Sequence, residues 1–121
     1  MYSARLLDHF QNPRNVGELP PPAVTVEVSN PVCGDILRLS VEFRDGHVAE
    51  ARYKTRGCTA SIAAGSALTE LLIGRTPAGI ASLRAADIEN AVGGLAAESK
   101  HAALLAMDAA HAVLRKRDSR P

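Results

Sequence analysis

The sequence predicts an α+β domain in which three antiparallel strands come first and a set of helices follows. Apolar and polar residues alternate with a period of two in three runs between residues 24 and 55, which indicates strands. After residue 58 the apolar residues recur with the period of a helix. Strands followed by helices are typical of α+β folds, and 121 residues suffice for one domain with a single core. We therefore expect one domain over residues 1–121.

The N-terminal segment, residues 1–23, predicts a short helix and then a partly mobile lead-in. The helix is expected over residues 3–10, with Ser3 as a candidate N-cap. Three apolar side chains share one face of this helix: Leu6, Leu7 and Phe10. The next stretch, QNPRNVGELPPP, holds four of the seven prolines and predicts irregular structure.

The three strands are expected over residues 24–28, 36–43 and 47–55. The middle run has these apolar positions among polar partners: Ile36, Leu39, Val41 and Phe43. These positions do not keep a strict period of two, so the alternation is expected to be interrupted near Leu37 to Leu39. Because Arg44-Asp45-Gly46 is a hairpin turn signal, the economical topology is an antiparallel meander.

Helical periodicity begins directly after Cys58, in a helix that Gly74 can close. One face of that helix carries Ile62, Gly65, Leu68, Thr69 and Leu72. Thr76-Pro77 predicts the start of a short helix to about Leu83, because Thr is a good N-cap and Pro suits the first helical position.

Two more helices are expected before the C-terminus. Residues 86–92 form a short one that Gly93-Gly94 stops. The last runs from about Ser99 to Arg115 and is followed by a flexible tail over residues 116–121. Its inward-facing residues are Ala102, Leu105, Ala106, Ala109 and Val113.

Composition excludes several classes of function. A formal net charge of +1, 3% aromatic residues and no Trp leave neither a basic field nor stacking surfaces for nucleic acid. No run reaches transmembrane length, and MYSARLLDHF lacks the apolar stretch of a signal peptide, so no membrane contact and a cytoplasmic location are expected. In a reducing compartment the two cysteines are expected to be free thiols or ligands.

Two segments with cysteines lie at the ends of predicted elements. Cys33 and Asp35 flank a glycine in the turn between the first two strands, where a thiol and a carboxylate can face one site. The alternative is a buried structural cysteine and an aspartate that caps its own backbone. Cys58 lies between a strand and a helix N-terminus, where backbone N–H groups and Arg56 favour a thiolate. Its alternative is a cysteine buried under the helix.

His101 lies at the start of the last helix, a position that favours a neutral ring able to accept a metal. The alternative is a half-exposed surface histidine. Because all these candidates lie where one element ends and another begins, they can gather at one end of the sheet. Cys33, Asp35, Cys58 and His101 then offer four donors, the number that tetrahedral Zn²⁺ requires, and the set also suits iron.

Four segments resemble the U-type iron–sulfur cluster scaffold family, the IscU/NifU N-terminal domain. DHFQNPRNVG (8–17) is similar to the family's N-terminal signature, and PVCGD (31–35) to its first-cysteine motif. KTRGCTASIA (54–63) is similar to the second-cysteine motif, in which a strand ends in GC and a helix of small residues follows. KHAALLAMDA (100–109) resembles the last helix with its HC…LA-x-DA pattern. Order and spacing agree over nearly the whole chain.

The resemblance implies a three-stranded antiparallel sheet with helices packed on one face, and a scaffold protein that is not an enzyme. Family members receive sulfur from a cysteine desulfurase and assemble a [2Fe–2S] cluster for delivery to acceptor apoproteins; apo forms often hold Zn²⁺. Carried over by position, the implied metal ligands are Cys33, Asp35, Cys58 and His101, and the two cysteines bind the cofactor. We expect a monomer or a weak homodimer.

Two features depart from the family pattern. Ala102 stands where the family has its third cysteine, the main persulfide acceptor. LAAES (95–99) stands where the Isc type has an LPPVK chaperone-binding motif, so docking of the dedicated Hsp70-type chaperone is not expected.

Three functions are compatible with these residues. The first is a scaffold that binds Fe²⁺, a [2Fe–2S] cluster or Zn²⁺ through a ligand set that is harder than three thiolates. The second is a degenerate scaffold that acts as an interaction or regulatory partner of a cysteine desulfurase without carrying a cluster. The third is a thiol enzyme with Cys58 as nucleophile, His101 as base and Asp35 as the group that orients it. The family resemblance favours the first.

Overall fold

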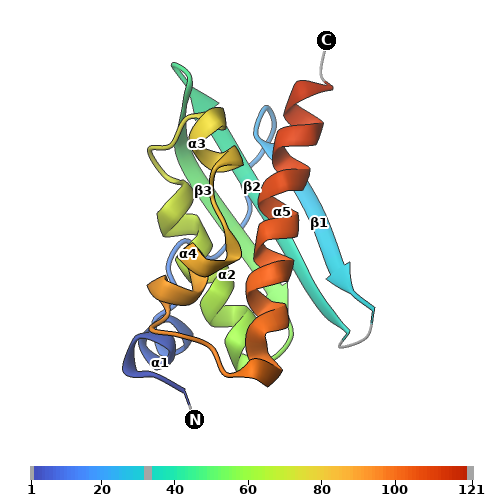
Figure 1. Cartoon of the computed structure of the whole chain (residues 1–121). Helices are drawn as coiled ribbons and strands as arrows, with labels where there is room; N and C mark the ends of the chain where they lie inside the picture. The colour runs from blue at the N-terminus through green and yellow to red at the C-terminus, as the bar shows by residue number, and fades with distance from the viewer. Residues whose placement is uncertain (1, 32–33, 120–121) are drawn as a thin grey trace.

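The computed structural model describes residues 2–31 and 34–119 (Figure 1). The elements in chain order are α1 (Ala4–Gln11), β1 (Val24–Asn30), β2 (Asp35–Arg44), β3 (His47–Arg56), α2 (Thr59–Leu72), α3 (Pro77–Ala81), α4 (Ala85–Ala91), the 3₁₀ turn η1 (Ala97–Ser99) and α5 (Lys100–Asp118).

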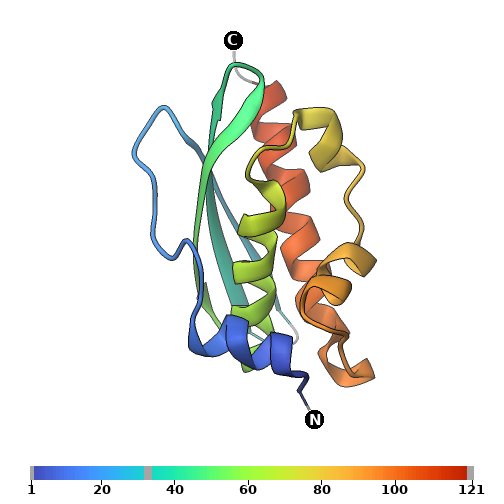
Figure 2. The ribbon, with the colours of Figure 1, turned by 90° about the vertical axis from the view of Figure 1, so that its left-hand side faces the viewer.

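The fold has two layers. The sheet order is β1-β2-β3, and both strand pairs are antiparallel. Seen edge-on, α2 and α5 lie together on one side of this sheet (Figure 2). The predicted α+β class, the antiparallel meander and the placement of the helices on one face are confirmed.

The alternation along β2 differs from the prediction. Leu37, Leu39 and Val41 all point into the core and are at most 1% exposed, so there is no slip between Leu37 and Leu39. The register shifts later, between Glu42 and Phe43. The prediction grouped Ile36 with Leu39 and Val41, whereas Ile36 is only half-buried and Leu37 takes the buried position. The strand therefore alternates regularly from Leu37.

Small residues let α2 pack closely on the sheet. A Cβ atom on Gly65 would lie 2.5 Å from two ring atoms of Tyr53, so only glycine fits at this position. The Tyr53 hydroxyl donates to the carbonyl oxygen of Ile62 at 2.8 Å, and burial raises the pKa of Tyr53 to about 12. The Tyr53 ring thus fixes the distance between β3 and the first half of α2.

The buried face of α1 is not the predicted one. Leu6 is buried as expected, but Leu7 and Phe10 are 38% and 37% exposed, and His9 takes the second inward position. His9 Nδ1 lies 2.8 Å from the Ser66 hydroxyl of α2. A polar contact with α2 therefore decides which side of this short helix faces inward.

The segment after α1 crosses to the free edge of β3. Tyr53 N–H donates to the Asn15 carbonyl and Gly17 N–H donates to the Tyr53 carbonyl, both at 2.9 Å. A side-chain contact adds to this, because Asn15 donates to the Thr69 hydroxyl at 3.1 Å. These bonds join the N-terminal segment to both layers.

The last helix is longer than predicted. All five predicted inward-facing residues of α5 are buried, but the helix continues to Asp118, three residues beyond the expected end at Arg115. Residues 116–118, predicted as part of a flexible tail, belong to this helix, and Lys116 Nζ donates to the Thr25 carbonyl at 2.7 Å. No helix among residues 2–31 and 34–119 is both long enough and apolar enough to cross a membrane.

Candidate metal centre

Three of the four predicted site residues meet at one end of the molecule. Asp35 begins β2, Cys58 is the N-cap of α2, and His101 lies in the first turn of α5. Their ligand atoms all lie within 4.8 Å of one another. His101 Nε2 is 3.3 Å from Asp35 Oδ2, and Cys58 Sγ is 3.8 Å from each of these two atoms. The structure thus brings Asp35, Cys58 and His101 together, and their role as metal ligands stays a prediction.

Cys33, the fourth predicted ligand, lies outside the described residues, and its part in the site stays a prediction. Gly34 directly precedes Asp35. Its φ of +75° lies in the left-handed region that favours glycine. Gly34 N–H donates to the Asn30 carbonyl at 2.7 Å, which closes this turn.

The pairing of β2 with β3 explains why Asp35 lies beside Cys58. Ile36 pairs with Arg56, so the next residues outward, Asp35 and Gly57, lie opposite each other at the end of the two strands. A Cβ atom on Gly57 would lie 2.7 Å from Asp35 Oδ1 and 2.8 Å from its Cγ. The carboxylate therefore occupies the space that a side chain at position 57 would need.

Asp35 is buried, with 4% of its surface exposed, and a buried carboxylate requires hydrogen-bond donors. The Ser61 hydroxyl supplies one: it donates to Asp35 Oδ2 at 2.5 Å and lies 3.4 Å from Cys58 Sγ. Sequence reasoning did not identify Ser61. Its spacing, three residues after a cysteine that caps a helix, was the available signal, because residues three apart lie on one helix face.

The other ring nitrogen of His101 defines its tautomer. Nδ1 lies 3.1 Å from the Glu98 carbonyl oxygen of η1. A carbonyl oxygen can only accept, so Nδ1 donates to Glu98, and Nε2 is the ring nitrogen that faces Asp35 and Cys58. Metal-binding histidines are held in the same way, with the second nitrogen donating to a carbonyl or carboxylate.

Cys58 and His101 differ in solvent exposure from Ala102, the residue that follows His101. Cys58 is exposed and His101 is half-buried, so both are reachable from solvent. Ala102, by contrast, is 1% exposed and packs within the main core. The position at which the family pattern has a third cysteine is therefore filled here by a small core side chain.

The arrangement suits metal binding better than nucleophilic catalysis. In a catalytic triad the acidic residue holds the ring nitrogen that faces away from the nucleophile. Here Asp35 and Cys58 both face Nε2, so the carboxylate does not hold the ring from its far side. Sulfur, oxygen and nitrogen donors that converge on one point are instead the ligand types of Zn²⁺ and iron.

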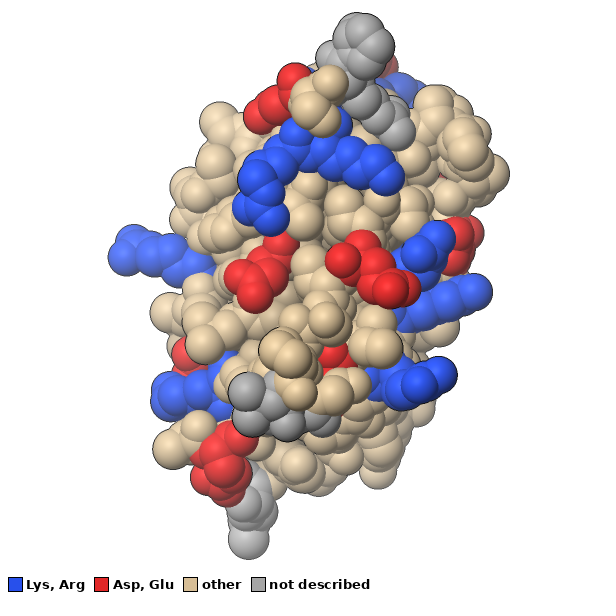
Figure 3. Space-filling model, turned by 90° about the vertical axis from the view of Figure 1, so that its right-hand side faces the viewer, with Lys and Arg blue, Asp and Glu red and all other residues tan. Residues whose placement is uncertain are grey.

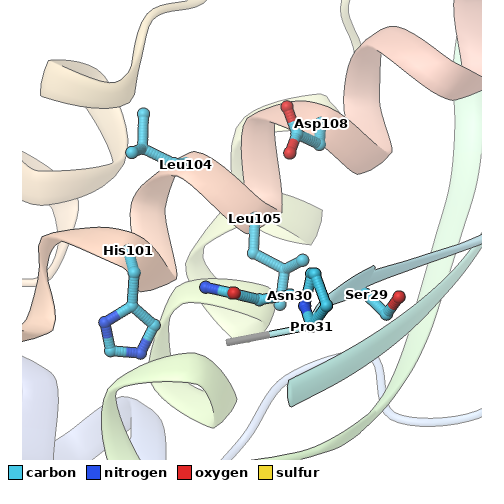
Figure 4. Close-up of a pocket in the computed structure, with 7 residues that line it drawn as sticks. All are labelled: Ser29, Asn30, Pro31, His101, Leu104, Leu105 and Asp108. Atoms are coloured by element: carbon cyan, nitrogen blue, oxygen red, sulfur yellow. The ribbon is translucent and has the colours of Figure 1, made fainter. Parts of the chain in front are cut away.

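A cavity of about 240 Å³ adjoins the site on the side of α5 (Figure 4). It is lined by Ser29, Asn30, Pro31, His101, Leu104, Leu105 and Asp108. His101 and Asp108 both come from α5, with two leucines between them, and the end of β1 forms the other wall. A ligand or partner group in this cavity would lie beside His101, next to Asp35 and Cys58.

The basic side chains of α5 lie at the other end of this helix. Arg115, Lys116 and Arg117 occupy its last turn, far from His101 in its first turn. Figure 3 shows blue side chains near the C-terminal end, with acidic and basic groups mixed over the rest of that face. The cations of this helix end therefore do not belong to the site.

Comparisons with known proteins agree on one family. Residues 1–121 match the family model of the NifU-like N-terminal domain. The chain is 38% identical over 109 residues to the iron–sulfur cluster assembly scaffold protein IscU 1 of Archaeoglobus fulgidus, covering 90% of this chain and 71% of that protein. It is 36% identical over 118 residues to the IscU scaffold protein of Azotobacter vinelandii, covering 94% of this chain and 91% of that one.

A longer relative and a solved structure extend this comparison. The chain is 44% identical over 112 residues to the bifunctional protein NifU/MnmA of Rubrobacter xylanophilus, covering 91% of this chain but only 23% of that protein. The crystal structure of the N-terminal part of a nitrogen-fixing NifU-like protein from Brucella abortus superimposes with a TM-score of 0.80 at 20% identity, covering 98% of this chain and 95% of that one. At this identity the likeness shows the fold.

Proposed function

Because the chain belongs to the family of NifU-like N-terminal domains and IscU-type iron–sulfur cluster assembly scaffolds, we propose that it binds iron, a [2Fe–2S] cluster or Zn²⁺ as part of cluster assembly or transfer. The ligands in this proposal are Asp35, Cys58 and His101. Cys33 is the proposed fourth ligand. Scaffold proteins of this type are not enzymes, so the metal or cluster is cargo that the protein holds and passes on.

The observation that supports this proposal is the convergence of three different ligand atoms within 4.8 Å, with Nδ1 of His101 held by the Glu98 carbonyl so that Nε2 faces the other two. The donor set fits such cargo: one thiolate, one carboxylate and one imidazole are ligands that zinc and iron accept. Because a carboxylate and an imidazole are harder than thiolates, we expect the site to favour Zn²⁺ or Fe²⁺ over a robust cluster.

The residues have separate parts in this proposal. Asp35 is a fixed ligand, because it is buried and hydrogen-bonded before any metal arrives. Cys58 presents an exposed thiol at the N-terminus of α2, where it can bind metal or accept sulfur.

Two classes of partner follow from the family: a cysteine desulfurase that supplies sulfur and apoproteins that accept the cluster. Their contacts with this chain, a cytoplasmic location and a monomeric or weakly dimeric state stay predictions.

One observation favours a second candidate, a degenerate scaffold that binds a desulfurase without carrying a cluster. Ala102 removes a family thiolate. Complementation of a scaffold-deficient strain by the Cys33→Ala and Cys58→Ala variants would support this candidate, whereas loss of complementation in both would support the metal-binding scaffold.

Anaerobic reconstitution with iron and sulfide tests the proposal, with the visible absorption of the wild type compared with that of Ala102→Cys. We expect the wild type to take up iron but to form a cluster that is more labile than that of Ala102→Cys, and Cys58→Ala to lower the absorption of both. The same stable cluster in the wild type and in Ala102→Cys would show that the missing thiolate does not matter.

A further inference from the structure

We propose that Ser61 is a positioning residue of this centre, which holds the metal-facing oxygen of Asp35 in place through its buried hydroxyl. This inference rests on the proposed function, because it assigns Ser61 a part in the metal binding of Asp35. Ser61 touches no metal in this proposal. It acts chiefly through Asp35, which accepts its hydrogen bond, although the same hydroxyl also lies 3.4 Å from Cys58 Sγ.

The geometry places the hydrogen bond on one particular oxygen. Ser61 donates to Asp35 Oδ2 at 2.5 Å, and the same Oδ2 is the atom that lies 3.3 Å from His101 Nε2 and 3.8 Å from Cys58 Sγ. Oδ2 is therefore both the ligand atom and the acceptor of the serine. A carboxylate oxygen has two lone pairs, so it can accept one hydrogen bond and bind a metal at the same time.

Burial makes this hydrogen bond informative. Ser61 is 1% exposed, so water does not compete for its hydroxyl. A serine inside a helix commonly donates to a carbonyl of its own preceding turn, but the Ser61 hydroxyl donates to a side chain on another element. It links the first turn of α2, which directly follows Cys58, to the start of β2.

Gly57 holds the other side of the same carboxylate. Asp35 Oδ1 fills the space next to the Gly57 Cα, so the carboxylate lies between a backbone without a side chain and the serine hydroxyl. Removing the hydroxyl frees Oδ2 to rotate away from Cys58 and His101. Partners that orient a metal ligand are typically worth about 10- to 100-fold in metal affinity.

A double-mutant cycle on Zn²⁺ affinity tests the inference. Zn²⁺ dissociation constants are measured by competition with a chromophoric chelator for the wild type, Ser61→Ala, Asp35→Ala and the double variant. We expect Ser61→Ala to weaken Zn²⁺ binding by about 10- to 100-fold in the wild-type background and to cause a much smaller loss in the Asp35→Ala background, where only the contact of Ser61 with Cys58 Sγ remains. Such non-additivity distinguishes an effect through Asp35 from a general loss of packing.

Two further comparisons control for folding. Ser66 is a second buried serine of α2, but its hydroxyl contacts His9 and Arg14 N–H, away from the site. Ser66→Ala is therefore expected to lower the free energy of unfolding without changing Zn²⁺ affinity. Ser61→Thr and Ser61→Val share one shape, and only the threonine keeps a hydroxyl. We expect tighter Zn²⁺ binding by the threonine variant than by the valine variant.

Three results would overturn the inference: no loss of affinity in Ser61→Ala, an equal loss in the Asp35→Ala background, or equal affinities of the threonine and valine variants. A wild type that binds no Zn²⁺ is a different outcome, because it overturns the proposed function and, with it, the role of Ser61. The wild-type titration thus separates the two failures.

Discussion

Asp35 Oδ2 and His101 Nε2 lie 3.3 Å apart at the meeting point of β2 and α5, with the ring held from its far side by the Glu98 carbonyl. A metal can bind this ring only at Nε2, because Nδ1 donates to the carbonyl. We therefore expect Zn²⁺ to shift the ¹⁵N resonance of His101 Nε2 strongly in a long-range ¹H–¹⁵N spectrum, while Nδ1 keeps the shift of a protonated nitrogen. A larger shift at Nδ1 would show that the ring binds metal in another orientation.

Replacement of Gly57 is expected to displace the Asp35 carboxylate. In Gly57→Ala the new Cβ would lie 2.7 Å from Asp35 Oδ1, so backbone or carboxylate must move. We expect weaker Zn²⁺ binding, measured by chelator competition. Gly79→Ala is the matched control, because its Cβ meets neighbours at 3.4 Å or more and lies in α3, away from the site. Equal affinities of the two variants would contradict the tight contact.

Gly65→Ala is expected to destabilise the fold, although alanine is normally the better helix former by about 1 kcal/mol. Its Cβ would lie 2.5 Å from two atoms of the Tyr53 ring, and overpacking of this kind costs about 1–3 kcal/mol. Urea unfolding measures the change. In a Tyr53→Leu background the ring clash is absent, and we expect the penalty of Gly65→Ala to shrink or reverse. A penalty of the same size in both backgrounds would place the strain elsewhere.

His9 makes stability depend on pH. Burial lowers the pKa of His9 below its usual 6.5, and the charge of Arg14 lowers it further, while Glu70 and Asp8 act in the opposite direction. The unfolded chain therefore binds a proton on His9 more readily than the folded chain does. The free energy of unfolding must then fall as the pH drops through about 6.5 and below.

This pH dependence can be measured by urea unfolding between about pH 7.5 and about pH 5. His9→Asn keeps a polar group within reach of the Ser66 hydroxyl but removes the titrating ring. We expect its unfolding free energy to fall less steeply with decreasing pH than that of the wild type. An unchanged slope would assign the titration to other groups.

Periodicity predicted the strands, the hairpin and the inward face of α5 because these features depend on local alternation and on turn chemistry. The face of α1 was mispredicted because His9 is buried by a polar contact with Ser66, which no hydrophobic pattern contains. The beginning of β2 was misjudged because Ile36, an apolar residue, is only half-buried and points to the opposite face from its buried neighbour Leu37.

Only part of the site could be predicted, because the sequence marks the ends of helices and strands but not the contacts between them. Asp35, Cys58 and His101 lie at element boundaries, which the sequence marks. Ser61 and Gly57 became visible only through their contacts with Asp35, which depend on the pairing of β2 with β3 and on the path from β3 into α2. The place of Cys33 stays a prediction from its motif.

Titration of the metal-free protein with Co²⁺, followed by absorption, tests most directly whether Asp35, Cys58 and His101 bind one metal ion together. We expect one equivalent to bind with a thiolate-to-metal charge-transfer band, Cys58→Ser to weaken that band, and Asp35→Ala and His101→Ala each to lower the affinity. A wild type that binds no Co²⁺, or binding that none of the three substitutions affects, would contradict the account.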